Sequence, residues 1–312
     1  MTATASHPTT DRWPELPFED WKDTAATLHM WTQIVGKIRM VQTPWINHSW
    51  SVALYVSPRG LTTSPIPHGD RRFQIDFDFL NHQLLISSSD DKSRTIPLEP
   101  QTTADFYAQV MGALTQLEMP VEIYAQPNEV EEAIPFAEDE QHASYDAEAA
   151  QRFWRALLQV DRIFTKFRAG FLGKSSPSHF FWGSFDLAVT RFSGRTAPEH
   201  PGGYPNMPLD VMREAYSHEV SSAGFWPGGE QMPFPIFYSY AYPTPEGFSE
   251  VEVKPEGAKW NPDLGEFVLP YDEVRRATSP DQMLMEFLET TYKGAARLAD
   301  WDIQGLEQTF RQ

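Results

Sequence analysis

Residues 179–195 read HFFWGSFDLAVTRFSGR, and this stretch decides most of what we expect of the fold and its chemistry. Phe180–Phe192 is a largely apolar run typical of a buried β-strand, yet Asp186 lies in its middle. A carboxylate buried without a partner costs several kcal/mol, so we expect Asp186 to be paired, hydrogen-bonded or protonated. The candidate cations for such a pair are Arg191, Arg195, Lys37 and Arg39.

Strand alternation places Asp186 on a polar face, together with Trp182, Ser184, Ala188 and Thr190. The opposite face is apolar and carries Phe181, Phe185, Leu187 and Val189. The polar face has two interpretations. It lines a small-molecule cleft with an aromatic wall, or Asp186 forms a buried salt bridge that ties a helix to the sheet.

Outward from this stretch, helical and strand-like patterns alternate in the same order twice. An apolar stripe predicts a first helix, formed by Trp21, Ala25, Leu28, Trp31, Val35 and Ile38. Period-two segments such as 73–79 and a further helix over 104–117 follow, and a second helix–strands–helix series begins at about residue 153. We therefore predict an α+β fold of two similar halves, each a helix, several antiparallel strands and a helix, with the helices packed on the sheet.

The predicted boundaries are a disordered tail at 1–12, a first half at 13–125, an acidic connector at 126–145 and a second half at 146–312. The two halves are also compatible with one compact pseudo-symmetric domain. Ile34-x-x-Lys37-x-Arg39 matches Ile163-x-x-Lys166-x-Arg168, which suggests an internal duplication. Chance similarity of short strings is the alternative.

The first predicted helix carries a polar line, because His29, Gln33 and Lys37 are spaced i, i+4 and i+8. His29 and Lys37 form an anion or carbonyl site, or the line is a solvated flank with one packed histidine; we favour the second. Separately, the alternating tyrosines of the run 238–242 indicate a half-buried sheet face or a subunit interface.

Composition restricts the classes of function. The chain has 312 residues, no cysteine and a net charge of −18, from 25 basic and 43 acidic residues. We therefore expect no thiolate chemistry and no nucleic-acid partner.

No membrane-length apolar run or export signal occurs, so we expect a cytoplasmic protein that does not bind membranes. No cofactor fingerprint occurs, and the spacing of His179, Asp186, His200, His218 and Glu219 fits no metal motif, so neither cofactor nor metal is expected.

Several long strings cover almost the whole chain: WPxLP at 13–17, TLHMWTQIVGKIR at 27–39, RGLTT at 59–63, HFFWGSFDLAVTRFSGR at 179–195, EAYSHEV at 214–220, GFWPG at 224–228 and YSYAYP at 238–243. In these strings the chain resembles a bacterial family known only as a domain of unknown function. The resemblance implies membership of that family. It supplies no activity, cofactor or catalytic residue.

Two functions from different classes remain open. The first is a binding or interaction module with an aromatic-lined cleft for a small molecule or a protein partner. Its candidate ligand-binding residues are His29, Lys37, Arg39, Trp182, Ser184 and Arg191. The second is a hydrolase or transferase for a small polar or anionic substrate, with His179 or His218 as acid and base and Asp186 orienting the histidine. It requires one of these histidines within hydrogen-bond reach of Asp186.

Overall fold

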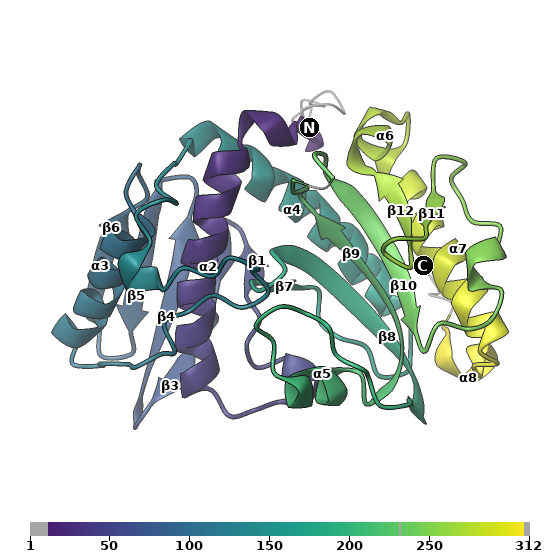
Figure 1. The fold of residues 1–312 in the computed structure, drawn as a ribbon, viewed down its shortest axis with the longest axis horizontal. Helices are drawn as coiled ribbons and strands as arrows, with labels where there is room; N and C mark the ends of the chain where they lie inside the picture. The colour runs from purple at the N-terminus through teal and green to yellow at the C-terminus, as the bar shows by residue number, and fades with distance from the viewer. Residues whose placement is uncertain (1–11, 231, 309–312) are drawn as a thin grey trace, which may run out of the picture.

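The structure is a computed structural model that describes residues 12–230 and 232–308. Over these residues it contains seven α-helices and two antiparallel sheets of six strands each, which confirms the predicted α+β class (Figure 1). Residues 1–11 of the predicted tail lie outside the described residues.

The first sheet has the strand order β1-β2-β4-β5-β6, with β3 paired to β4. Its strands are β1 (Tyr55–Ser57), β2 (Gly60–Thr62), β3 (Ile66–His68), β4 (Arg71–Asp78), β5 (Gln83–Ser88) and β6 (Ser93–Pro97). The second sheet has the order β11-β12-β10-β9-β8-β7. Its strands are β7 (His179–Phe181), β8 (Asp186–Thr196), β9 (His218–Trp226), β10 (Ile236–Tyr242), β11 (Lys259–Asn261) and β12 (Glu266–Pro270).

The helices flank these two sheets. They are α2 (Lys22–Gln42), α3 (Thr103–Gln116), α4 (Ala147–Ala169), α5 (Leu209–Ala215), α6 (Tyr271–Arg276), α7 (Pro280–Leu298) and α8 (Ile303–Leu306). Helix α2 is buried on all sides between residues 30 and 39, so the expected solvated flank is wrong. No helix within 12–230 and 232–308 combines the length and apolar character that a membrane span requires.

The predicted strand over 180–192 is a hairpin instead. Strand β7 ends at Phe181, residues 182–185 form a turn in which Phe185 has a φ of 59°, and β8 begins at Asp186. The turn escaped prediction because Trp182 and Phe185 are themselves buried, and an apolar run does not distinguish a buried turn from a strand. Trp182 and Ser184 therefore do not share a strand face with Asp186.

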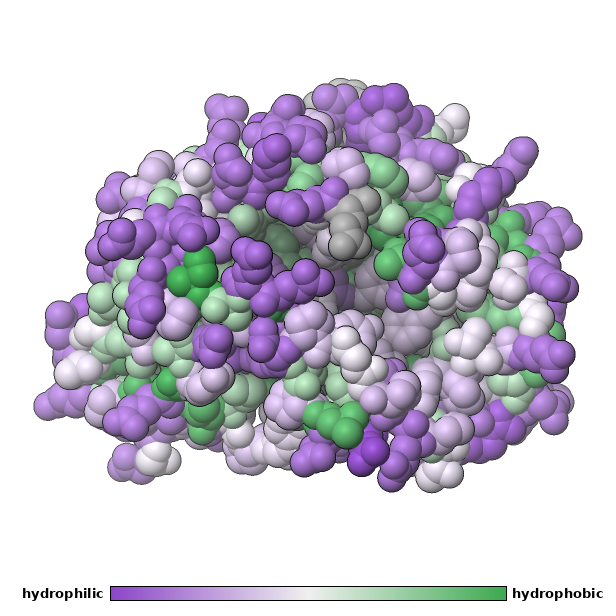
Figure 2. All heavy atoms as spheres, viewed as in Figure 1, coloured by the Kyte–Doolittle hydropathy of each residue, from purple (hydrophilic) through white to green (hydrophobic). Residues whose placement is uncertain are grey.

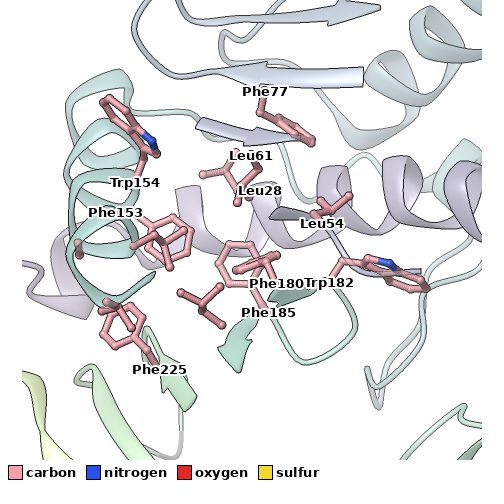
Figure 3. Close-up of a cluster of buried hydrophobic side chains, with 14 of the residues drawn as sticks. Leu28, Leu54, Leu61, Phe77, Phe153, Trp154, Phe180, Trp182, Phe185 and Phe225 are labelled. Atoms are coloured by element: carbon pink, nitrogen blue, oxygen red, sulfur yellow. The ribbon is translucent and has the colours of Figure 1, made fainter. Parts of the chain in front are cut away.

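This buried turn lies where the segments before and after the predicted connector meet. The ring of Phe185 stacks on Phe153 of α4, with ring centroids 5.3 Å apart, and meets Phe180 edge-on at the same distance (Figure 3). Leu54 of the first half and Phe180 of the second exchange two backbone hydrogen bonds of 2.8 Å. Each large apolar side chain buried here contributes about 1.5–3 kcal/mol, so the junction is a strong part of one continuous core.

Helix α2 tolerates this packing because residue 36 is glycine. A methyl group at Gly36 would overlap the indole ring of Trp182, whose Nε1 donates a 2.9 Å hydrogen bond to the carbonyl of Val52. The absence of a side chain at Gly36 thus allows Trp182 to pack directly against the backbone of α2.

We expect Gly36→Ala to lower the free energy of unfolding by about 1–3 kcal/mol, because overpacking forces neighbouring side chains to shift. The matched control is Gly112→Ala in α3, where nothing lies within 4 Å of the added methyl group. It should raise stability by about 0.5–1 kcal/mol through the better helix propensity of alanine. Thermal unfolding followed by circular dichroism measures both, and equal stability of the two variants would contradict the assigned contact.

Candidate functional site

The second sheet has one core face and one open face. Leu187, Val189, Phe225 and Phe237 are buried on the side of the sheet that α4 and α7 cover. Helix α4 runs behind these strands in Figure 1. The opposite side carries the alternating tyrosines Tyr238, Tyr240 and Tyr242, which are half-buried. No long helix crosses the front of these strands in Figure 1, and Figure 2 shows the surface hollowed over them. We call this feature the tyrosine hollow.

Asp186 lies in the floor of the tyrosine hollow and is only 6% exposed. Its carboxyl group accepts a hydrogen bond from the hydroxyl of Tyr238, which reaches it from β10 across the intervening strand β9. Gly224 of β9 makes this crossing feasible, because a methyl group there would overlap the Tyr238 ring. The predicted requirement for a hydrogen bond is thus met by a tyrosine and not by any of the four expected cations.

Two other carboxyl groups, those of Glu129 and Glu266, are electrostatically coupled to Asp186. Burial, together with the nearby Glu129, raises the pKa of Asp186 to about 7, although the Tyr238 hydrogen bond opposes the shift. Burial and the charge of Asp186 raise the pKa of Glu266, at the start of β12, to about 8. Burial also raises the pKa of Glu129. Among the described residues, no lysine, arginine or histidine side chain forms an ion pair or hydrogen bond with these three carboxyl groups.

Hydroxyl groups continue the polar lining of the hollow. The hydroxyls of Tyr216 and Tyr240 lie 2.9 Å apart, and Ser222 hydrogen-bonds both Tyr240 and, at 2.9 Å, Thr190. The ring of His200 stacks on Tyr216 with centroids 4.5 Å apart. The hollow is therefore lined by aromatic rings that carry hydrogen-bonding groups at their ends.

The predicted acidic connector contributes directly to the hollow. Glu129 has a φ of 58°, its backbone N–H donates to the carbonyl of Pro205 at 2.9 Å, and its carboxylate accepts a hydrogen bond from the Ser184 hydroxyl. A side chain at Gly183 would overlap this carboxylate. Positive φ is unfavourable for glutamate, and such strain is concentrated at functional sites.

The polar line of α2 holds this same connector segment. The amide of Gln33 donates to the carbonyl of Asn128 at 2.8 Å, and the ammonium group of Lys37 donates to the Asn128 side chain. Lys37 is 1% exposed, and burial lowers its pKa to about 8. His29 lies 2.7 Å from the carbonyl of Gly183, and burial lowers its pKa to about 4. These side chains attach the connector and the turn to α2.

The two arginines predicted to bind a ligand are buried among other partners. Arg39 donates to the carbonyl of Ser51 and to the hydroxyl of Ser64, at 2.8 and 2.9 Å. Arg191 lies on the core face, with its guanidinium carbon 3.4 Å from the centre of the Phe167 ring and 4.4 Å from that of Tyr292. Neither arginine is a hydrogen-bond partner of Asp186, because the side chain of each is occupied by the partners just named.

The two candidate catalytic histidines do not join Asp186 either. His179 is 1% exposed, its Nδ1 has no hydrogen-bond partner among the described residues, and burial lowers its pKa to about 3. His218 lies 3.1 Å from the Ser217 hydroxyl and beside the ring of His48. The hydrogen-bonded His–Asp pair that the enzyme hypothesis requires is therefore not formed.

Sequence reasoning missed Glu129 and Glu266 as site residues. The available signal in the sequence was the tyrosine alternation over 238–242. It identified the open face of β10 but not which residues of other strands and loops lie beside it. Glu266 comes from β12 and Glu129 from a loop, and only the folded sheet brings them near Asp186. In the described parts of the chain, no three metal-ligating side chains come close enough to hold a metal ion.

The fold and the site together define an α+β protein with an acidic, tyrosine-lined hollow on one face of an antiparallel sheet. No match is found among curated proteins or among solved structures. A family of unknown function, DUF5996, matches residues 13–308, and the chain therefore belongs to this family. The resemblance noted in the sequence is thereby confirmed.

We expect Asp186→Asn to gain stability relative to wild type as the pH rises from about 6.5 to about 8. Because the folded-state pKa is about 7 and the ordinary value is 3.8, the folded protein holds a proton that the unfolded chain has released, and this stability is lost as the pH rises. The difference in unfolding free energy should shift by about 1 kcal/mol in favour of the variant.

Chemical denaturation of both proteins at the two pH values measures this shift. The comparison cancels the buried histidines His29 and His179, whose lowered pKa values give a stability that is lost as the pH falls below about 6.5. A difference between the two proteins that does not change with pH would mean that Asp186 stays ionised throughout.

Proposed function

We propose that this protein binds a small organic cation in the tyrosine hollow. The observation that carries the proposal is the set Glu129, Asp186 and Glu266, three carboxyl groups that face one hollow without a basic partner among the described residues. Buried carboxylates are ordinarily paired. Here Asp186 is buried, Glu129 and Glu266 are half-buried, and none of the three forms an ion pair with another described residue, which favours a cation supplied by a ligand.

The surrounding rings suit the same ligand. Tyr238 and Tyr240 are stacked side by side with centroids 6.1 Å apart. Tyrosine faces attract cations, and their hydroxyl groups accept hydrogen bonds from ammonium groups. An alkylammonium or guanidinium group therefore matches both the carboxyl groups and the rings.

The ligand is proposed to be organic because of the distribution of the carboxyl groups. Within the described residues no three acidic or histidine side chains lie close enough to coordinate one metal ion. Aromatic rings also contribute nothing to the oxygen-ligand shell that calcium or magnesium prefers. An organic cation is large enough to touch rings and carboxyl groups together.

A second candidate function is hydrolysis or group transfer on a small polar substrate. The observation that favours it is the pKa of Asp186, about 7, which suits a general acid or base at neutral pH. The chemistry would then use Asp186 with Glu266 in place of a histidine.

We expect n-butylammonium to bind the wild-type protein while butan-1-ol, of the same length but uncharged, does not. Ligand-observed NMR titration at pH 8 measures both, because weak binding is accessible to it. Asp186→Asn should weaken n-butylammonium binding at least about tenfold, as expected for loss of a hydrogen bond to a charged group.

The matched control is Glu148→Gln, which removes one negative charge from a side chain that is 91% exposed on α4. This variant should bind n-butylammonium as wild type does. Equal binding of n-butylammonium and butan-1-ol, or an equal effect of the two variants, would overturn the proposal.

A further inference from the structure

The three carboxyl groups of the tyrosine hollow form a row and not a cluster. Glu129 lies against the turn at 182–185, Asp186 begins β8, and Glu266 begins β12. Two strands, β9 and β10, separate β8 from β12, so these two strands are roughly 14 Å apart at the usual strand spacing. The register aligns Val189 with Phe267, so Glu266 is also displaced along the strand direction from Asp186.

The electrostatic couplings follow the same order. In addition to burial, Glu129 raises the pKa of Asp186 and Asp186 raises the pKa of Glu266, whereas no coupling between Glu129 and Glu266 contributes to either pKa. Asp186 therefore occupies the middle of the row. Glu266 makes no side-chain hydrogen bond to another described residue, which leaves its carboxyl group available at one end.

Tyr204, in the loop before α5, is electrostatically coupled to all three carboxyl groups. Tyr204 hydrogen-bonds Tyr216, and the charges of Glu266, Glu129 and Asp186 all raise its pKa in addition to burial. The loop is joined to the connector through Glu129, whose N–H donates to Pro205, and through Asn206, whose side chain donates to the carbonyl of Val130 at 2.7 Å. Tyrosines of β10 and of this loop therefore both lie near the row.

We infer that the ligand of the tyrosine hollow is an elongated cation with at least two separated positive charges, of the diamine or polyamine class. The inference rests on the proposed function and adds the shape and charge of the ligand. A compact cation at Asp186 leaves Glu266 without a partner at the far end of the row. An alkyl chain between two ammonium groups lies along the tyrosine rings while its ends reach separate carboxyl groups.

The test compares 1,4-diaminobutane with n-butylammonium, which has the same chain length and one charge, by NMR titration at pH 8. The wild-type protein should bind the diamine at least about tenfold more tightly, as expected for a second charge-assisted hydrogen bond. Glu266→Gln should reduce this ratio to near one while leaving n-butylammonium affinity within about threefold of wild type.

Glu148→Gln controls for the overall negative charge of the protein, and circular dichroism confirms that each variant is folded. If n-butylammonium binds and the diamine binds no more tightly, the inference is wrong and the proposed function stands. If neither amine binds, both are wrong. If the diamine binds more tightly but Glu266→Gln and Glu148→Gln keep the same ratio, the preference comes from net charge alone and the inference is wrong.

Discussion

The buried turn at residues 182–185 is the contact on which both the core and the candidate site depend. On one side, Trp182 lies against the backbone of α2 and Phe185 stacks on Phe153 of α4, so the turn joins these two helices. On the other side, Gly183 and Ser184 receive the carboxylate of Glu129, and the next residue after the turn is Asp186. Because apolar packing fixes the turn, it also fixes the positions of two carboxyl groups without requiring a salt bridge.

The two faces of the second sheet differ: one packs in the core, and the other carries the candidate site. Its core face buries aliphatic and aromatic side chains against α4 and α7, and even the buried Arg191 is accommodated there by aromatic rings. Because the core face supplies this packing, the open face does not need large apolar side chains. Small residues on β9 then allow long side chains to lie across the strand, as Gly224 does for Tyr238. The hollow exists because β9 carries the small side chains of Ser222 and Gly224 where its neighbour β10 carries tyrosines.

The sequence predicted the class of fold because that depends on local periodicity, as in the apolar stripe of α2 and the alternation of β4 and β10. It also predicted that Asp186 needs a hydrogen bond or a proton, since this follows from burial alone.

The hydrogen-bond partner of Asp186 was not predictable, because Tyr238 lies 52 residues away and reaches Asp186 only through the order of three strands. The surroundings of His179 and Arg191 were not predictable for the same reason, since they depend on the tertiary fold. Both side chains suit catalysis or anion binding, but the fold places them among core residues. The duplication and the division into halves stay predictions.

Protonation explains how the fold tolerates three carboxyl groups in one hollow that have no ion-pair partner among the described residues. With pKa values near neutrality, Asp186 and Glu266 are partly uncharged when no cation is bound, so the folded state avoids the full cost of holding several like charges in one hollow. A bound cation favours the ionised forms, so binding must release protons and must strengthen as the pH rises through this range. The net charge of −18 adds a long-range attraction for cations that salt screens. The same acidic groups are thus compatible with folding when protonated and with cation binding when ionised.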